Sequence, residues 1–377
     1  MKNFRLAAAR FACTWLLLPA LLAGGSAVAQ ETGPSMPSQD DSATAFGQSA
    51  DIRLFIDQMA AKHGFARNEL EATFSQVHYQ KKAVRLVKPA PPGKPKNWQA
   101  YRARFVEPVR INAGVKFWNR HASDLARAEK QYGVPAEIIV AIIGVESIYG
   151  RHTGNFRVLD TLATLAFDYP DVPKRAARMA FFRDELENAL LLARESGVDP
   201  LSLRGSYAGA IGWAQFMPGS IRQYGVDFDH DGKIDLRESP TDAIGSIANY
   251  LTRHGWQNGE PIAFPAHLNS SAQNRLESLL NKGLKATFWP ADLEVAGVTS
   301  TVELPTNIRF GLVDLQNGSE PTEYWLGTAN FFAIAKYNRS YFYAMSVADL
   351  GRAVRAARNA DLNGVQAAAE AEAEQPD

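Results

Sequence analysis

The feature that most constrains the fold is the stretch IIVAIIGVESIYG, in which every residue before Glu146 is apolar or glycine. Pro135 precedes it, and proline is favoured in the first turn of a helix, so the pattern predicts a buried helix. Glu146 then lies four and three residues after Ile142 and Ile143 and shares their apolar face. A buried helix of this kind requires a core around it, and the carboxylate on its buried face needs an explanation.

An ionised carboxylate on an apolar face costs several kcal/mol unless it is paired, so burial favours the protonated form of Glu146. A carboxyl group that stays protonated near neutral pH can act as a general acid. The alternative is a structural glutamate near the end of its helix that pairs with an arginine such as Arg151. The helix alone does not choose between these two hypotheses.

The first 29 residues have the pattern of a secretory signal peptide. Three basic residues precede an apolar run, and the small residues Ala27, Val28 and Ala29 follow it. The run is shorter than the ~20 residues of a membrane-spanning helix, which argues against a membrane anchor. The only cysteine, Cys13, lies before most of this run. Lipid attachment at the cleavage site and disulfides in the mature protein are therefore not expected.

Composition indicates an ordinary globular protein. Of the 377 residues 46% are hydrophobic, which suffices for a sizeable core and, by length, for two or three domains. The signal peptide holds three of the 40 basic residues and none of the 40 acidic ones, which leaves a mature net charge of −3. This near balance does not indicate nucleic acid or anionic lipid as a partner.

Helical periodicity dominates the chain, so the predicted fold is mainly α with a small β-containing insertion. The insertion is expected where β-branched and aromatic residues mix with proline and glycine, and the alanines of the C-terminal tail can extend the helix before it. The predicted organisation is signal peptide 1–29, flexible leader 30–50, N-terminal helical domain 51–130, central core 131–259, mixed insertion 260–325, C-terminal helices 326–358 and polar tail 359–377.

A second motif, GSYAGAIGWAQFMPGSIRQYG, contains three glycines at positions where the backbone must approach something closely. Ser206, Trp213 and Gln215 add a hydroxyl, a flat ring and an amide, the groups with which proteins bind sugars. The alternative is a tight helix–helix crossing that needs the glycines only for packing.

Together with GVESIYG, this motif and the stretches DAIGSIANYLTRHGW (242–256) and KYNRSYFYAMSV (336–347) resemble the membrane-bound lytic murein transglycosylase B family. The resemblance runs in the same motif order from about Tyr101 to Arg358. It implies a lysozyme-like catalytic core at 131–259 that acts on peptidoglycan, with Glu146 as the sole catalytic acid and base. The absence of a lipid-acceptor cysteine favours a soluble periplasmic member.

The resemblance also implies a substrate-binding cleft. The positions that match its lining are Tyr101, Ser206, Gln215, Tyr250, Tyr337, Asn338 and Tyr343. From the residues alone, the tyrosines of 336–347 also suit the packed face of a helix, and Asn338 also suits a cap or turn.

A third motif, DFDHDGKIDLRE (227–238), has the twelve-position spacing of an EF-hand calcium loop, with glycine at position 6 and glutamate at position 12. The alternative is a polar surface turn whose acids fall in register by chance. A single loop is expected to hold a structural Ca²⁺ rather than to signal. The predicted ligands are Asp227, Asp229, Asp231, the carbonyl of Lys233, Asp235 and Glu238. No organic cofactor is expected.

Three functions remain open. The leading one is a lytic transglycosylase that cleaves the MurNAc-β-1,4-GlcNAc bond of peptidoglycan glycan strands and forms 1,6-anhydro-MurNAc. A hydrolytic muramidase would need a second carboxylate or a positioned water, and the candidates are Asp160, Asp168 and Asp171. The third is a non-catalytic peptidoglycan-binding scaffold. Cell-wall synthases and division proteins are candidate partners, and the expected location is the periplasm.

Overall fold

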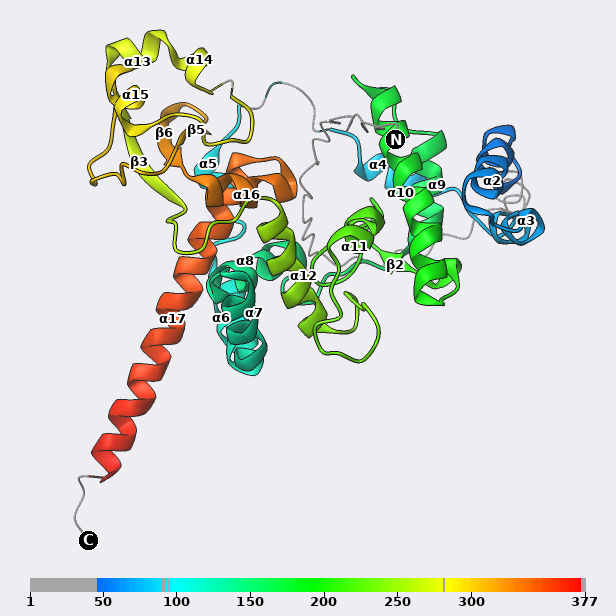
Figure 1. Cartoon of the computed structure of the whole chain (residues 1–377), viewed down its shortest axis with the longest axis horizontal. Helices are drawn as coiled ribbons and strands as arrows, with labels where there is room; N and C mark the ends of the chain where they lie inside the picture. Colours follow the sequence, from blue (N-terminus) through cyan, green and yellow to red (C-terminus); the bar gives the residue numbers. More distant parts are fainter. Residues whose placement is uncertain (1–45, 90–92, 94, 281, 374–377) are drawn as a thin grey trace, which may run out of the picture.

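The computed structural model describes residues 46–89, 93, 95–280 and 282–373 (Figure 1). The predicted signal peptide and most of the predicted flexible leader lie outside these residues. Among the described residues, none of the helices combines the length and apolar character needed to cross a membrane.

The first part of the described chain forms short helices with clear local signals. Ser49 caps the first of them, and Gly64 ends it in the left-handed region at φ 65°. Glu107 caps another, in which Pro108 takes the first helical position. These helices are α2 (Ala50–His63), α3 (Arg67–Phe74), α4 (Lys81–Leu86), α5 (Trp98–Arg102), α6 (Pro108–Arg120) and α7 (Ala122–Tyr132).

The middle of the chain builds the main hydrophobic core around the predicted buried helix. This helix packs against α6, α7 and two later helices, and its isoleucines are fully buried. The elements of this part are α8 (Ala136–Ser147), β1 (Phe156–Arg157), α9 (Val158–Phe167), α10 (Arg175–Ser196), a 3-10 turn (Pro200–Ser202), β2 (Arg204–Gly205), α11 (Pro218–Tyr224) and α12 (Pro240–Arg253). The two short strands pair with each other in antiparallel fashion.

An antiparallel sheet of order β4-β3-β6-β5 follows, and three short helices lie beside it (Figure 1). A second, smaller hydrophobic cluster with Leu293, Phe310 and Leu326 at its centre lies within this part. The elements are β3 (Ala263–Leu268), α13 (Ser270–Asn274), α14 (Leu276–Leu280), α15 (Pro290–Val295), β4 (Val298–Thr299), β5 (Gly311–Asn317) and β6 (Glu320–Gly327).

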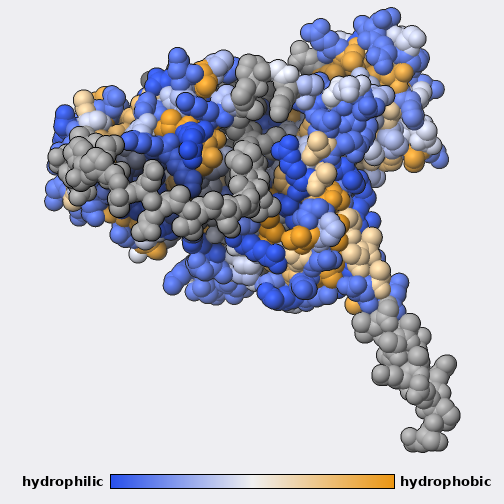
Figure 2. Space-filling model, turned by 180° about the vertical axis from the view of Figure 1, so that it is seen from behind, coloured by the Kyte–Doolittle hydropathy of each residue, from blue (hydrophilic) through white to orange (hydrophobic). Residues whose placement is uncertain are grey.

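The last two helices, α16 (Ala329–Asn338) and α17 (Tyr341–Ala373), return to the main core. The first half of α17 packs on α8 and α6, and its second half extends away from the body of the molecule (Figure 1). From behind, the surface is largely hydrophilic, with apolar residues in small patches (Figure 2). The prediction of a mainly α fold with a small β-containing part is confirmed.

Candidate active site

Glu146 lies at the C-terminal end of α8, where the backbone leaves the helix abruptly. Ile148 and Tyr149 take φ values of 49° and 55°, and Gly150 follows at 80°. Side chains with a Cβ rarely adopt this left-handed region, and it costs about 1–2 kcal/mol per residue. The hydroxyl of Ser147 helps to hold this turn, because it donates to the Trp213 carbonyl at 2.9 Å and accepts from the Gly150 N–H at 3.1 Å.

The carboxyl group of Glu146 has a raised pKa and one side-chain hydrogen bond. Burial raises its pKa to about 7, and the hydrogen bond from Tyr343 works in the opposite direction. That bond joins the Tyr343 hydroxyl to Oε1 at 2.7 Å. The residue is still partly exposed to solvent, and among the described residues no ion pair reaches it, Arg151 included. The hypothesis of a structural Glu146–Arg151 pair therefore has no support.

Three tyrosines from three helices form an aromatic wall beside Glu146. The rings of Tyr337 and Tyr343 stack 5.9 Å apart, and Tyr250 meets Tyr337 edge-on at 4.9 Å. The hydroxyl of Tyr337 donates to the Ala214 carbonyl at 2.6 Å. Burial, and next the charge of Glu146, raise the pKa of Tyr337 and Tyr343, so both phenols stay protonated donors.

Two polar atoms near this wall are buried and have no hydrogen-bond partner in the described chain. They are the hydroxyl of Tyr101 and the Oδ1 of Asn338. The negative charge of Glu146 also contributes to raising the pKa of Tyr101, after burial itself, which places that phenol within electrostatic reach of the carboxyl group. A buried polar atom without a partner is costly, so these two groups suit a ligand that supplies the missing bonds.

Ser206 and Gln215 differ from these two residues because their side chains already bond to backbone groups. The Ser206 Oγ accepts the backbone N–H of Ala210 at 3.0 Å, and its side chain is almost fully buried. Gln215 sits at φ 49°, and its side-chain amide donates to the carbonyls of Thr153 and Gly212. Both side chains therefore shape the loop 205–217, and the carbonyl oxygen of the Gln215 amide is the part left for a ligand.

The glycines of this loop allow close backbone approach rather than a helix crossing. A Cβ on Gly212, which has φ 74°, would overlap the carbonyl of Leu236 in the acidic loop 227–238. The next residue, Trp213, donates its backbone N–H to Leu236 at 2.8 Å and its indole N–H to Arg237 at 2.9 Å. The indole thus joins the two loops instead of presenting a free N–H to a sugar.

Two of the three candidate second acids are engaged elsewhere. Asp160 pairs with Arg157 at 2.7 Å and accepts the backbone N–H of His78, and Asp168 accepts the hydroxyl of Tyr79 at 2.5 Å. These bonds fasten α9 to the segment after α3. For Asp171 no contact with Glu146 is found in the described part of the chain.

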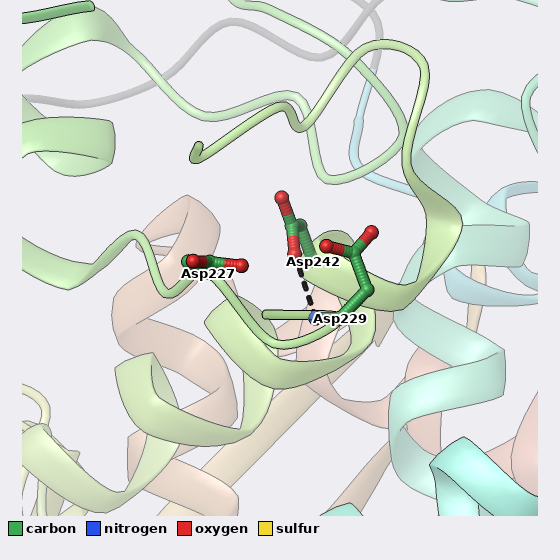
Figure 3. Close-up of side chains that lie close together, drawn as sticks. All are labelled: Asp227, Asp229 and Asp242. Atoms are coloured by element: carbon green, nitrogen blue, oxygen red, sulfur yellow. Dashed lines mark hydrogen bonds between the residues drawn. The ribbon is translucent and has the colours of Figure 1, made fainter. Parts of the chain in front are cut away.

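The acidic loop brings carboxylates together, but not the complete predicted set. Ligand oxygens of Asp227, Asp229 and Asp242 all lie within 4.8 Å of one another (Figure 3). Asp231 accepts the backbone N–H of Lys233, and the carboxylate of Asp235 accepts two backbone N–H groups, from Arg237 and Glu238. Glu238 is 77% exposed and lies 3.2 Å from the Arg237 guanidinium. The carbonyl of Lys233 is on an exposed part of the loop.

Asp242 is the residue that the loop spacing missed. It is fully buried at the start of α12, where its carboxylate accepts the N–H groups of Phe228 at 2.7 Å and Asp235 at 2.8 Å. Its oxygens are therefore engaged by the backbone of the loop and hold the loop in shape next to the carboxylates of Asp227 and Asp229. The signal in the sequence was the Ser-x-x-Asp pattern from Ser239 to Asp242, which is typical of a helix start. In the structure Ser239 caps α12 by accepting the N–H of Asp242.

Comparison with known proteins gives a consistent result. A family model described as the transglycosylase SLT domain matches residues 47–352. Membrane-bound lytic murein transglycosylase B of Escherichia coli is 43% identical over 322 residues, which cover 83% of this chain and 85% of that protein. The crystal structure of catenated lytic transglycosylase SltB1 from Pseudomonas aeruginosa is 45% identical, with a TM-score of 0.75, and covers 83% of this chain and 100% of that one.

Two further solved structures contain ligands. Escherichia coli lytic transglycosylase Slt35 in complex with calcium is 42% identical, with a TM-score of 0.72, and covers 83% of this chain and 95% of that one. Pseudomonas aeruginosa SltB3 in complex with NAG-anhNAM-pentapeptide is 31% identical, with a TM-score of 0.66, and covers 82% of this chain and 80% of that one.

Proposed function

Because this chain belongs to the transglycosylase SLT domain family and so to the lytic transglycosylases of peptidoglycan, we propose that Glu146 is its single catalytic acid and base. The observation that carries the proposal is the state of this carboxyl group. It is held by Tyr343, has a pKa of about 7, and lacks both an ion-pair partner and a second carboxylate among the described residues around it. A carboxyl group with that pKa can give and take a proton near neutral pH.

In the first step protonated Glu146 gives its proton to the glycosidic oxygen while the bond from that oxygen to C1 of MurNAc breaks. The N-acetyl group of the substrate stabilises the positive charge that develops at C1. Glu146, now a carboxylate, takes the proton of the C6 hydroxyl as its oxygen bonds to C1. The sugar closes to 1,6-anhydro-MurNAc, the proton is back on Glu146, and no water is consumed.

The neighbouring residues supply orientation and hydrogen bonds. Tyr343 holds one oxygen of Glu146, so the other oxygen is free to face the glycosidic bond. The unpartnered atoms of Tyr101 and Asn338 are proposed to bond the sugar, and Tyr250, Tyr337, Gln215 and Ser206 are proposed to line the cleft beside it. The anhydro sugar held by the SltB3 relative has the ring that this reaction produces.

A hydrolytic muramidase remains the alternative for the same carboxyl group. An inverting hydrolase needs a second carboxylate about 6.5–9.5 Å away, and a retaining one needs it at about 5–5.5 Å. Asp160 and Asp168 are bonded to other partners, which favours the single-carboxylate reaction. A non-catalytic scaffold gives no reason for a carboxyl group that burial holds at a raised pKa without an ion-pair partner, because burying such a group costs stability.

The loop 227–238 is proposed to hold a structural Ca²⁺. The donors of Asp227 and Asp229 are carboxylate oxygens, which suit a hard cation, and Slt35 binds calcium in its crystal structure. In this role Asp231, the Lys233 carbonyl, Asp235 and Glu238 complete the twelve-position set. The cation would neutralise clustered negative charge and so stabilise the loop that Trp213 joins to the Glu146 turn.

The proposed location is the periplasm, where peptidoglycan lies. The proposed binding partner is the glycan strand with its peptides, and cell-wall synthases or division proteins are candidate protein partners. The proposed domain organisation places residues 260–325 as an insertion between the core and the final helices.

The deciding experiment is the chemistry of the products from purified cell wall. Hydrolysis leaves a reducing MurNAc end that borohydride reduces, whereas the proposed reaction leaves a 1,6-anhydro end that is lighter by one water and inert to borohydride. Mass spectrometry is expected to find anhydro-muropeptides as the dominant product. A mainly reducible pool would assign the protein to the muramidases instead.

A further inference from the structure

Outside the site around Glu146, a surface pocket of about 400 Å³ lies between α10 and α11. Its volume is within the range of small-ligand sites. The lining residues are Glu185, Asn188, Gly219, Ser220, Arg222 and Gln223. All of them except the glycine carry a polar or charged side chain, so the pocket suits a polar group and not an apolar one.

Glu185 is the buried charge of this pocket. The residue is only 9% exposed, and its Oε2 accepts the N–H of Gly219 at 2.8 Å. Burial raises the pKa of its carboxyl group to about 7, and the hydrogen bond from Gly219 opposes this rise. No cation forms an ion pair with it in the part of the chain that the structure describes. An unpaired buried carboxylate costs several kcal/mol, so a bound cation would relieve it.

The one cation that lines the pocket is already engaged. The guanidinium of Arg222 forms two bonds to Glu195, at 2.8 and 2.9 Å, and a third to Asn188 at 2.5 Å. The hydrogen bond from Gly219, at the start of α11, goes to Oε2 of Glu185 alone. No hydrogen bond to Oε1 is found among the described residues. The pocket therefore has a buried carboxyl group with an acceptor oxygen left over and no counter-ion.

We infer that this pocket binds the free primary ammonium group of the peptidoglycan stem peptide, with Glu185 as its counter-ion. The inference rests on the proposed function. The amino end of a stem peptide is bound to MurNAc as an amide and its carboxyl groups are negative, so the side-chain amine of its diamino acid is its only cation. Cross-linking acylates this amine and removes the charge. The pocket thus selects peptides that are not cross-linked.

The position of the pocket fits this role. Gly219 is four residues after Gln215, so the two are at most roughly 14 Å apart, whereas an extended pentapeptide spans roughly 16–18 Å. The link is also held against the aromatic wall, because Phe216, just before α11, and Tyr224, the last residue of α11, both pack on Tyr250. A sugar beside Gln215 can therefore place its peptide in the pocket.

The test is equilibrium binding of two probes to the full chain by calorimetry. One probe is the stem pentapeptide with its amino end capped as an amide, as it is on MurNAc, so that the side-chain amine is its only cation. The other is the same capped peptide acetylated on that side-chain amine. The wild-type protein is expected to bind the free amine about tenfold or more tightly, since a charge-assisted hydrogen bond is lost on acetylation. Glu185→Gln can still accept from Gly219 but has no charge, so it should bind both peptides equally weakly. Asp361→Asn removes a charge from the exposed part of α17 and should keep the preference.

Three outcomes would overturn the inference: equal binding of both peptides by the wild type, no binding of the free-amine peptide at millimolar concentration, or a preference that survives Glu185→Gln. The wild-type comparison stands even if Glu185→Gln fails to fold. Because binding needs no turnover, the same measurement on Glu146→Gln separates this inference from the assignment of the catalytic acid. If Glu185 only fastens α11, its substitution will lower the melting temperature and leave the ratio of the two affinities unchanged.

Discussion

At the scale of single residues, the proposed chemistry depends on one proton on Glu146. The isosteric change Glu146→Gln removes that proton and keeps an acceptor for Tyr343. Turnover on purified cell wall is expected to fall by about 10²–10⁴-fold or more, while circular dichroism stays native. A folded variant that still lyses the wall at the wild-type rate would remove Glu146 from the mechanism.

The same substitution should change how stability depends on pH. The pKa of Glu146 is raised from 4.5 to about 7 on folding, so the native state keeps a proton that the unfolded chain releases between these pH values. Wild-type stability therefore contains a contribution that is present below pH 4.5 and is lost as the pH rises to 7. Glu146→Gln has no such loss. The difference between its melting temperature and that of the wild type should therefore shift in favour of the variant from pH 4.5 to pH 8. This shift is equivalent to about 1–3 kcal/mol of unfolding free energy. A constant difference across this range would mean that the folded-state pKa is not raised.

Tyr343 is expected to adjust the pKa of the proposed acid, Glu146, through its hydrogen bond. Its hydrogen bond to Glu146 favours the ionised form and lowers the pKa of the carboxyl group, so Tyr343→Phe should raise that pKa. The alkaline limb of the kcat/KM profile should move to higher pH, with a loss in rate of about tenfold at pH 7 from the missing orientation. Tyr337→Phe, which loses a bond to a carbonyl and none to Glu146, is the matched control. An identical shift in both variants would point to general loosening of the wall.

At the scale of elements, the acidic loop and α12 act as one unit. A cation that binds only the folded loop should raise the melting temperature by mass action, with an affinity as weak as about 10⁻⁴–10⁻³ M. Asp227→Ala combined with Asp231→Ala should abolish this response, whereas Asp361→Ala on the exposed part of α17 should keep it. A wild-type melting curve that ignores both calcium and chelator would reduce the loop to a surface turn.

Asp242 gives the loop its shape in the absence of any ion. The two carboxylate oxygens of Asp242 accept the backbone N–H groups of Phe228, Asp229 and Asp235. Asp242→Asn retains only one of these two acceptor oxygens. Because backbone N–H groups then lose their partner, calcium affinity should fall and the calcium-free protein should lose about 1–3 kcal/mol of stability. Differential scanning calorimetry with and without calcium separates the two effects.

At the scale of the whole molecule, α17 contributes a buried half and a projecting half. Leu350 is fully buried against α8, near Gly144, so Leu350→Ala should cost about 2–4 kcal/mol of unfolding free energy. Truncation after Arg358 removes residues that are exposed wherever their side chains are described, and it should change stability by less than about 0.5 kcal/mol and leave wall lysis intact. Chemical denaturation measures both. A large loss on truncation would show that the projecting half has a contact of its own.

The sequence by itself determined the parts of this protein that depend on short-range patterns. The 3.6-residue periodicity placed Glu146 on a buried face, the twelve-position spacing marked the acidic loop that is proposed to hold a cation, and the change of composition near residue 260 marked the strands. The family resemblance then selected peptidoglycan cleavage. The polar tail, though, continues as helix to Ala373, as its alanines allowed.

Only the tertiary structure decided which distant groups meet. Tyr343 is 197 residues from the carboxyl group that it holds, Asp242 closes its loop from another element, and the indole of Trp213 serves the backbone of that loop instead of a sugar. Glu185 gave no signal in the sequence, because its buried, unpaired state arises from the packing of α10 on α11. Local patterns fix which face of an element is apolar, but the pairing of faces is set by the packing of the complete core, and so are the pKa values and hydrogen bonds at the site.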